Sequence, residues 1–341
     1  MDSAPWLADH PVLDALRRRR EKNEAPGSRS DDFKIGLAVE GGGIRGVVSA
    51  AMLCALEELG MARAFDAVYS ASSGAINSAY FLIGGSWYPL SIYYDDLATR
   101  KFVDFRRFLR GHILDLDYAF GVVVDQVKPL NYDAVVASPI PLHIAVTLAD
   151  EIRTEVVSDY TSRADLRHAL IASAWLPVAL KGTTDFRGKR AVDGGVLIPH
   201  PYRIALQDGC THVLSLSTRP IRPPRERASV SQRYAARHLN RIKEGLGTGY
   251  LEAMRHYRTE RRTLQQRMTE PGEPPYVLDL APLAWMPEVK RHEMDPGRII
   301  NGARGAYEVM YCAIEHRDPA LILAGRVRAV PRLTIVTKDD A

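Results

Sequence analysis

Short apolar runs alternate with small-residue turns and apolar helical stretches at the start of the patterned part of the chain. Residues 34–40 (KIGLAVE) form an apolar run bounded by charge and glycine, which is typical of a buried strand. A glycine-rich turn at 41–46 leads into residues 47–59, whose apolar spacing is helical. The same order recurs as a strand at 65–69, a turn at 70–74 and a helix at 75–82. Two consecutive units of this kind predict a parallel sheet covered by helices on both faces.

The remaining pattern extends this sheet. Further strands are predicted at 142–148, 154–157, 190–192, 211–217, 276–280 and 333–336, and further helices at 165–174 and 303–315. We therefore expect an α/β protein, a three-layer α/β/α fold with a central, mainly parallel sheet. Residues 1–32 read as an N-terminal extension, with four arginines followed by a polar linker. Residues 33–341 form one domain, with a motif-bearing core at 33–200 and a helical, basic C-terminal part at 219–341.

Composition narrows the class of protein only slightly. The 341 residues carry 45 Lys and Arg against 41 Asp and Glu, and this net charge of +4 does not indicate a nucleic-acid partner. No leader with an apolar segment behind its charges is visible, and no apolar run approaches the ~18 residues of a membrane span, so we expect a cytoplasmic protein. The three cysteines have neither a metal-ligand nor a disulfide spacing.

Basic residues are nevertheless concentrated in two segments. Residues 100–110 (RKFVDFRRFLR) predict an amphipathic helix with Phe102, Phe105 and Leu109 on one face. Residues 219–268 hold 13 Lys and Arg against 4 Glu. Both segments suit either an ordinary solvated surface or peripheral contact with an anionic membrane. Near the first of them, aromatic residues are candidates for either an acyl pocket or the core: Trp87, Tyr88, Tyr93, Tyr94, Tyr118 and Phe120.

The turn Gly41–Gly46 satisfies G-x-G-x-x-G between a strand and a helix. Its glycines leave backbone N–H groups open to an anion, which is either a pyrophosphate or a developing oxyanion. A dinucleotide site also requires an acidic residue at the end of the next strand, and that strand ends in serines at 70–73. This absence counts against a nucleotide.

The turn Ser70–Gly74 is compatible with a nucleophile elbow. In G-x-S-x-G, small residues allow a serine on a sharp strand-to-helix turn to expose its Oγ, and Ser72 takes this position. Ser70 replaces the first glycine. No histidine lies in a comparably marked turn. Asp193 precedes Gly194 and Gly195, which indicates either a simple turn or a carboxylate on backbone that closely approaches another element.

Taken together, these motifs resemble the patatin-like phospholipase family, which combines a G-G-G-x-[RK]-G loop, a G-x-S-x-G nucleophile and a D-G-[AG] motif in this order. The match covers residues 33–200 and includes Ala172–Pro177, similar to the family's A-S-x-x-x-P segment. The resemblance implies a histidine-free dyad in which Ser72 attacks an ester carbonyl and Asp193 accepts its proton. It also implies an oxyanion hole at Gly42, Gly43, Ile44 and Arg45, with motif glycines Gly41, Gly46, Gly74 and Gly194.

The expected function is therefore hydrolysis of carboxylic esters of lipids, with no cofactor, no metal and no nucleic-acid partner. Arg45 is expected either to steady the loop or to meet a phosphate head group. Two alternatives stay open at this stage: a catalytically silent scaffold, suggested by Ser70, and a dinucleotide-binding oxidoreductase, suggested by the glycine loop. The acyl chain, the head group and the oligomeric state are not determined by the sequence.

Overall fold

A central sheet of eight strands organises the protein, seen in a computed structural model that describes residues 5–110, 112–223 and 227–318. The hydrogen-bonded path is β5–β6–β3–β2–β1–β7–β8, and β4 pairs with β3. The strands are β1 (Ile35–Val39), β2 (Ala67–Ser70), β3 (Leu142–Leu148), β4 (Arg153–Val157), β5 (Thr184–Phe186), β6 (Lys189–Asp193), β7 (His212–Leu216) and β8 (Tyr276–Leu280).

Five of these strands run parallel, in the order β3, β2, β1, β7 and β8. Val39 of β1 pairs with Ser70 of β2 on one side and with Leu216 of β7 on the other. The carboxyl ends of three central strands therefore lie level with one another. Ligands of open parallel sheets bind outside such ends.

The antiparallel strands bring a distant segment to this same edge of the sheet. Ile144 of β3 pairs with Ser70 of β2 and with Val157 of β4, so β2 and β4 flank opposite sides of β3. Two residues further along β3, Val146 pairs with β4 and with Asp193 of β6. β6 therefore approaches along the same side of β3 as β2, from the opposite direction, and the two strands end facing each other.

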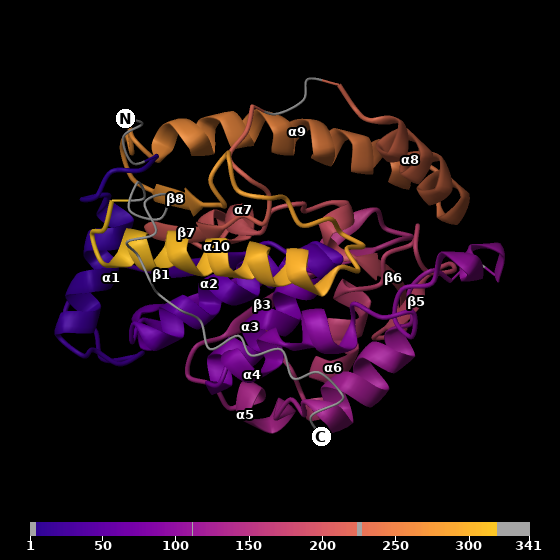
Figure 1. Ribbon diagram of the computed structural model, residues 1–341, viewed down its shortest axis with the longest axis horizontal. Coiled ribbons are helices and arrows are strands. Elements are labelled where there is room, and N and C mark those ends of the chain that lie inside the picture. Colours follow the sequence, from indigo (N-terminus) through magenta and orange to yellow (C-terminus); the bar gives the residue numbers. More distant parts are fainter. Residues whose placement is uncertain (1–4, 111, 224–226, 319–341) are drawn as a thin grey trace.

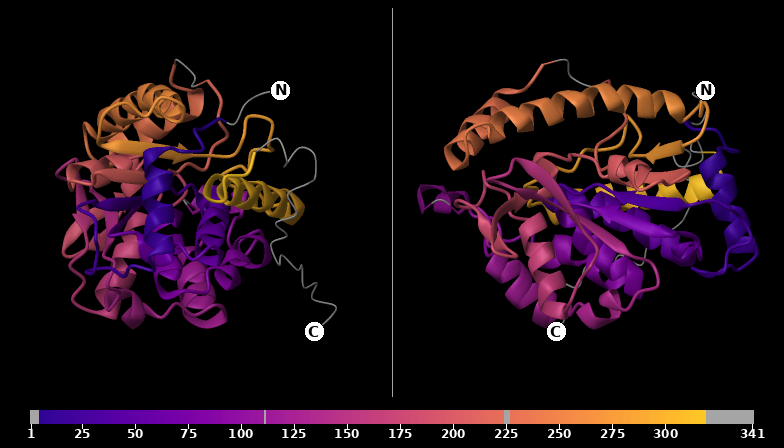
Figure 2. Two further views of the ribbon diagram at one scale, coloured as in Figure 1. Left: turned by 90° about the vertical axis from the view of Figure 1, so that its left-hand side faces the viewer. Right: turned by 180° about the vertical axis from the view of Figure 1, so that it is seen from behind.

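Helices cover both faces of the sheet (Figures 1 and 2). The helices are α1 (Pro11–Glu21), α2 (Val47–Glu58), α3 (Ser73–Ile83), α4 (Trp87–Leu90), α5 (Tyr132–Val136), α6 (Arg163–Ser173), α7 (Tyr202–Gln207), α8 (Val230–Ile242), α9 (Leu246–Arg267) and α10 (Pro296–Ile314). Short 3₁₀ or π turns are η1 (Gly43–Gly46), η2 (Ala62–Ala64), η3 (Ile92–Asp96), η4 (Phe105–Arg110), η5 (Asp117–Val127) and η6 (Gly194–Val196).

The two faces of the sheet differ in side-chain size. Ile35, Leu37 and Val39 of β1 point into the larger core, which also includes residues of α2 and α10. Ala38 points to the other face, which α7 covers. Close packing on that face requires Gly36, because a Cβ there would lie 2.8 Å from Cys210 Sγ and 3.0 Å from the Tyr69 ring. The three-layer α/β/α fold expected from the sequence is thus present.

Two segments outside the motif-bearing region also contribute to the structure. In α1, Leu13 and Leu16 are fully buried. Arg19 is buried as well, and it forms ion pairs of 2.7 Å with both Asp31 and Asp66. α8 and α9 run along the side of the molecule where β8 lies, at the top of Figure 1. The proposed division into an extension, a motif-bearing core and a basic C-terminal part stays a prediction.

Most of the predicted helices and strands are present in the structure, but some short elements were not predicted and one predicted helix is absent. Short elements without a marked pattern, such as α5, α7 and β5, were not expected. The predicted amphipathic helix over 100–110 is wrong: Phe102 is buried in a turn, and a 3₁₀ helix begins only at Phe105, which is 54% exposed. The strand predicted at 333–336 lies outside the described residues, as do the side chains at 108–110.

Candidate active site

Ser72 occupies a sharp turn between β2 and α3. Its backbone has φ 56° and ψ −140°, so a residue with a Cβ is held in the region that favours glycine. Such strain persists only where surrounding contacts fix it, and it is typical of a nucleophile elbow. The Ser72 N–H donates to Ser173 Oγ at 2.9 Å, and Ser173 Oγ donates to the carbonyl of Ala145 at 2.7 Å. A buried serine of α6 therefore fixes the elbow to β3.

Two glycines allow the first and second strand–helix turns to touch. A Cβ at Gly74 would lie 2.5 Å from the Val39 carbonyl oxygen, and a Cβ at Gly41 would lie 2.5 Å from the Ala71 carbonyl oxygen and 2.8 Å from Ser72 Cβ. Neither glycine has a positive φ, so glycine is required here for space rather than for conformation. The glycine loop and the elbow are therefore packed backbone to backbone.

Asp193 reaches Ser72 from the end of β6. Both residues line one pocket, and Asp193 Oδ1 accepts the Gly195 N–H at 2.7 Å. Burial raises the pKa of Asp193 to about 6, although the Ser72 hydroxyl, the Gly195 N–H and the charge of Arg291 oppose the rise. A carboxylate with this pKa is a better proton acceptor near neutral pH than a free one. Gly194 is needed because a Cβ there would lie 2.1 Å from the Ala145 carbonyl oxygen.

The glycine loop is partly engaged with protein groups. The Gly42 N–H donates to Ser73 Oγ at 2.9 Å, and the Ile44 N–H donates to the Arg291 carbonyl at 3.0 Å. Gly43 lines the pocket described below, and its N–H opens the short helix η1, where N–H groups lack partners within the helix. Of the four residues predicted for an oxyanion hole, Gly43 is the one that lines the pocket.

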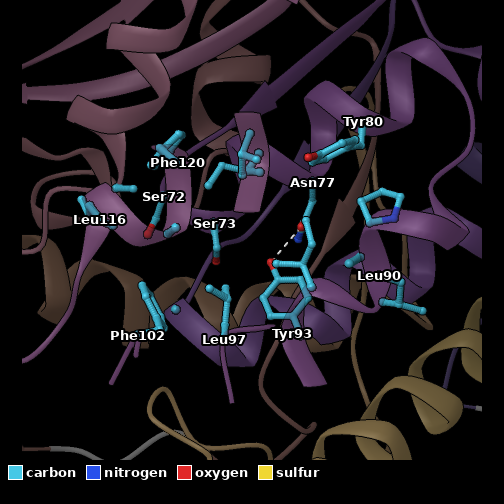
Figure 3. Close-up of a pocket in the computed structure, with 18 of the residues that line it drawn as sticks. Ser72, Ser73, Asn77, Tyr80, Leu90, Tyr93, Leu97, Phe102, Leu116 and Phe120 are labelled. Atoms are coloured by element: carbon cyan, nitrogen blue, oxygen red, sulfur yellow. Dashed lines mark hydrogen bonds between the residues drawn. The ribbon is translucent and has the colours of Figure 1, made fainter. Parts of the chain in front are cut away.

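A buried polar network holds this loop from behind. Tyr93 Oη donates to Asn77 Oδ1 at 2.8 Å, the dashed line in Figure 3, and Asn77 Nδ2 donates to the Gly46 carbonyl at 2.9 Å. Ser49 Oγ lies 3.0 Å from the Gly46 carbonyl and 2.9 Å from the Glu40 carbonyl. Neither Asn77 nor Ser73 was identified as a site residue from the sequence. An amide inside the apolar stretch AINSAYFL was the available signal for Asn77.

Arg45 lies behind the loop and not in the pocket. Its side chain is 4% exposed, its Nε donates to Thr218 Oγ1 at 3.0 Å, and its guanidinium packs against Gly42. Burial lowers the pKa of Arg45 to about 9. Burial favours a raised pKa for Glu40, but the charges of Arg45 and other cations lower it to about 2. Of the two roles considered for Arg45, this placement favours steadying the loop.

A largely apolar pocket extends from the serine and the aspartate. Ser72, Ser73 and Asp193 line it together with side chains of α2, α3, η3 and η5. Figure 3 shows Ser72 at one side of the pocket, near Leu116 and Phe102, while Tyr80 and Leu90 lie at the opposite side. Along α3 the lining runs from Ser73 to Tyr80, about 10 Å at a rise of 1.5 Å per residue. The pocket can hold an extended alkyl chain.

The candidate aromatic residues divide between the pocket and its surroundings. Tyr93 and Phe120 line the pocket, and so does Phe102 from the basic segment. The other four candidates do not line it: Trp87, Tyr88, Tyr94 and Tyr118. Sequence spacing could not make this distinction, because several of these aromatic residues belong to the π-type segments η3 and η5, in which the residues that face the pocket do not follow the period of an α-helix.

Another cluster of serine, histidine and aspartate lies apart from the pocket. His200 Nε2 is 3.0 Å from Ser217 Oγ and 3.3 Å from Asp279 Oδ1, and Ser215 Oγ donates to Asp279 Oδ1 at 2.6 Å. All four residues are at most 4% exposed, and Ser215 and Asp279 belong to the strands β7 and β8. These side chains are buried and hydrogen-bonded to one another between β7 and β8, and none of them lines the pocket that contains Ser72.

Neither a metal centre nor a membrane span is indicated by the described part of the chain. Its one group of three potential metal ligands comprises Asp9, Asp14 and His316, none of which lines the pocket. Among the residues described, no helix combines the length and apolarity needed to cross a bilayer.

Comparison with a known family agrees with this geometry. The family model for patatin-like phospholipase matches residues 37–206, which include Ser72, Asp193 and the glycine loop. None of the curated proteins matches the chain. Among solved structures, VipD from Legionella pneumophila is similar with a TM-score of 0.45 and 13% identity, over 84% of this chain and 68% of that one.

Proposed function

The chain belongs to the patatin-like phospholipase family through residues 37–206, and on this basis we propose that it hydrolyses lipid carboxylic esters with a Ser72–Asp193 dyad. The family indicates lipid acyl hydrolysis in general. The observation that carries the finer proposal is that two chain segments far apart in the sequence meet in one pocket: the strained Ser72 at the end of β2 and the buried Asp193 at the end of β6 both line it.

In the proposed mechanism, Ser72 Oγ attacks the ester carbonyl carbon while Asp193 accepts the serine proton. The tetrahedral intermediate collapses as Asp193 gives this proton to the leaving alkoxide, so the alcohol departs and an acyl group remains on Ser72. Asp193 then takes a proton from water as the water attacks the acyl ester, and it returns that proton to Ser72 Oγ when the fatty acid leaves. Ser72 and Asp193 line the same pocket, and in this mechanism their positioning replaces the histidine of a triad.

Electrostatic support for the oxyanion is proposed to come from the Gly43 N–H and from the N-terminal end of α3, whose dipole favours negative charge near Ser72. The Gly42 and Ile44 N–H groups would join only by leaving Ser73 Oγ and the Arg291 carbonyl. Arg45 takes part indirectly, because its guanidinium supports the backbone at Gly42.

The site also bears on the two alternatives. A pyrophosphate would need several free N–H groups of the glycine loop, and two of these donate to protein oxygens. A silent scaffold was suggested by Ser70, but position 70 has no positive φ and lies fully buried within β2. Glycine is therefore not required at position 70, and the strained residue of the elbow is Ser72 itself.

The apolar lining supports an acyl chain as the group bound beside Ser72. We also propose that the protein meets its lipid at a membrane surface without spanning it. Phe105 supports this contact: it is 54% exposed in the basic segment 100–110 and touches the His292 ring, whose neighbour Arg291 bonds the glycine loop. This contact is a proposal separate from the chemistry.

Hydrolysis of a lipid panel tests the proposed function. Phospholipids, lysophospholipids and neutral glycerides with one common acyl chain are presented in mixed micelles to the wild type and to Ser72→Ala. We expect fatty-acid release by the wild type and background release by the variant. Release that is equal in both proteins, or absent from the wild type for every ester, would contradict the proposal.

A further inference from the structure

Ser73, the residue after the proposed nucleophile, presents its side chain to the same pocket. Ser72 and Ser73 both line this pocket, and Figure 3 shows their hydroxyl oxygens turned to the same side. Ser73 is the first residue of α3 and is only half-buried. The chemistry proposed above uses the hydroxyl of Ser72 and gives that of Ser73 no part in the reaction.

The glycine loop fixes the position of this hydroxyl. The Gly42 N–H donates to Ser73 Oγ at 2.9 Å. A serine oxygen accepts up to two hydrogen bonds and still donates its own proton to a further acceptor. Because Gly42 uses one lone pair of Ser73 Oγ, the oxygen is held beside the loop while the hydroxyl proton stays available.

Gly46, the last residue of the glycine loop, leaves room for the Ser73 hydroxyl. A Cβ at Gly46 would overlap Ser73 Oγ and would lie 2.7 Å from Tyr93 Oη. The φ of Gly46 is −57°, an ordinary helical value, so glycine is needed here for space and not for conformation. The hydroxyls of Ser73 and Tyr93 therefore lie close together beside Gly46.

The phenol oxygen of Tyr93 is an acceptor for the Ser73 proton while the pocket is empty. Tyr93 Oη gives its own proton to Asn77 Oδ1 at 2.8 Å, so its oxygen can still accept a hydrogen bond. Burial raises the pKa of Tyr93, and the Asn77 side chain and the Ser73 hydroxyl oppose this rise. The Ser73 hydroxyl thus faces a neutral acceptor, and hydrogen bonds to a charged oxygen are stronger.

We propose that Ser73 is a further catalytic residue, whose hydroxyl donates a hydrogen bond to the oxyanion formed at Ser72. This inference rests on the proposed ester hydrolysis. When Ser72 Oγ bonds to the carbonyl carbon, the π electrons of the C=O bond move to its oxygen, and the Ser73 O–H rotates from Tyr93 Oη to that oxygen. The proton stays on Ser73 throughout. Side-chain hydroxyls and backbone N–H groups both serve as oxyanion donors in enzymes.

This arrangement gives Gly42 a part in catalysis without breaking its hydrogen bond. As a direct donor, the Gly42 N–H would first have to leave Ser73 Oγ. In the proposed chain, Gly42 donates to Ser73 and Ser73 donates to the oxyanion, and each hydrogen bond of such a chain polarises the next one. The oxyanion donors are then the Ser73 hydroxyl and the Gly43 N–H, which belong to two residues of the pocket lining.

Removal of the hydroxyl tests the proposal. Ser73→Ala should lower kcat for a short-chain p-nitrophenyl ester by about 100-fold to 1,000-fold, the loss typical of one oxyanion-hole donor, with KM little changed. Ser73→Thr, which keeps a hydroxyl, should recover most of this loss. The pH midpoint of kcat/KM should not move, because the base Asp193 is unchanged. A kcat in Ser73→Ala that equals or exceeds the wild-type value would overturn the proposal.

A transition-state analogue separates an oxyanion donor from a residue that only shapes the pocket. An alkyl trifluoromethyl ketone adds to Ser72 Oγ and places an oxygen where the oxyanion forms, whereas the matching methyl ketone serves as the ground-state analogue. In Ser73→Ala, the affinity for the trifluoromethyl ketone should fall by the same factor as kcat/KM, and the affinity for the methyl ketone should not change. Equal losses for both ketones would assign Ser73 a structural role and overturn the proposal.

Ser78→Ala is the matched control. Ser78 is a fully buried serine of the same helix, its Oγ donates to the Gly74 carbonyl at 2.8 Å, and it does not line the pocket. This variant loses a hydroxyl as Ser73→Ala does, and it should keep the wild-type kcat and both ketone affinities. A loss in Ser78→Ala equal to that in Ser73→Ala would contradict a specific role for Ser73. Thermal melting of each variant separates a lost donor from a lost fold.

Failure of this proposal is distinguishable from failure of the proposed function. Ester hydrolysis that disappears in Ser72→Ala and is unaffected in Ser73→Ala would remove the Ser73 donor and leave the Ser72–Asp193 chemistry intact. Absence of hydrolysis of every ester by the wild type would contradict both proposals.

Discussion

Within the described residues, two clusters of serine and aspartate can be compared. The pocket cluster pairs Ser72 with Asp193 at the carboxyl ends of β2 and β6, and the buried cluster joins Ser215 and Ser217 to Asp279 and His200. By composition the buried cluster is closer to a catalytic triad, because it contains a histidine. By geometry it is not one, because its groups are at most 4% exposed and two of them lie within regular strands.

Backbone conformation and access separate the two clusters. Ser72 is half-buried, sits at φ 56° and lines an apolar pocket, whereas Ser215 and Ser217 have no exposed surface. The hydroxyls of the buried cluster donate to Asp279, so they satisfy a buried carboxylate and stabilise the β7–β8 edge. The candidate nucleophile is distinguished by its strained backbone and by its access to the pocket. The residue types in the two clusters do not make this distinction.

Substitution of the serines should separate the two clusters most strongly. Ser72→Ala should lower kcat/KM for a lipid ester by about 10⁴-fold to 10⁶-fold, the range seen when a serine nucleophile is removed. Ser217→Ala, its counterpart in the buried cluster, should keep kcat/KM within about threefold and lower stability by about 1 kcal/mol. Steady-state rates and thermal melting of both variants measure this. A catalytic loss in Ser217→Ala with Ser72→Ala unaffected would reverse the assignment.

The second largest difference in activity is expected between variants of the two aspartates, Asp193 and Asp279. Asp193→Asn removes the proton acceptor while keeping the shape, and kcat should fall by about 10³-fold to 10⁴-fold. Asp279→Asn should act on stability, by about 1–3 kcal/mol, because it weakens buried hydrogen bonds. Rates at saturating substrate and urea denaturation distinguish the outcomes. Turnover that persists in Asp193→Asn would mean that another group acts as the base.

Gly74→Ala tests whether activity depends on the close backbone packing between the elbow and the glycine loop. The buried cluster has no such elbow. The added Cβ would meet the Val39 carbonyl oxygen at 2.5 Å, so the elbow or the glycine loop must move. A displacement of about 1 Å at a catalytic group costs about 100-fold in rate, and we expect a loss of that order. Gly121→Ala is the control, since its Cβ would have no neighbour within 4 Å. Equal kcat/KM values for Gly74→Ala and wild type would remove the packing argument.

A smaller effect is expected from pH. Asp193 acts as the base only when it is deprotonated, and burial raises its pKa to about 6. Activity should therefore be constant above the pKa and fall about tenfold per pH unit below it. The pH dependence of kcat/KM on an uncharged ester measures this. A midpoint near ~4, the value for an unperturbed carboxyl, would indicate that Asp193 is not desolvated in solution.

Position 70 should give the smallest change in rate. Ser70→Gly restores the glycine of the family's elbow motif, yet Ser70 is fully buried in β2 without a positive φ. The rate should stay within about twofold of wild type, and stability should fall by about 0.5–1 kcal/mol, since glycine weakens a strand interior. Activity that appears only in Ser70→Gly would support the scaffold alternative.

The fold is predictable from the sequence where local signals agree. The runs at β1 and β2 are apolar, their turns contain glycine or serine, and the helices that follow have apolar spacing. The local sequence preference and the observed secondary structure therefore agree in this region. The segment 100–110 shows the opposite case. Its charges and aromatics fit a helix, but the burial of Phe102 in the pocket wall prevails over that local preference.

Some features of the site could be predicted from the sequence, and others required knowledge of how the strands pair. Ser72 and Asp193 were identified from their turns and the family resemblance. That β2 and β6 share one side of β3 follows only from strand pairing, and this is what brings the two side chains together. The contact between Arg291 and the glycine loop could not be predicted from the sequence. It is made by the backbone carbonyl of Arg291, and a residue of any type has such a carbonyl.

Labelling with a fluorophosphonate identifies the nucleophile itself, because the reagent forms a covalent adduct with an activated serine. Wild type, Ser72→Ala and Ser217→Ala are treated in parallel, and the modified peptide is identified by mass spectrometry. We expect one adduct on Ser72 in the wild type and in Ser217→Ala, and none in Ser72→Ala. An adduct on Ser215 or Ser217, or equal labelling of Ser72→Ala, would contradict the assignment of Ser72 as the nucleophile.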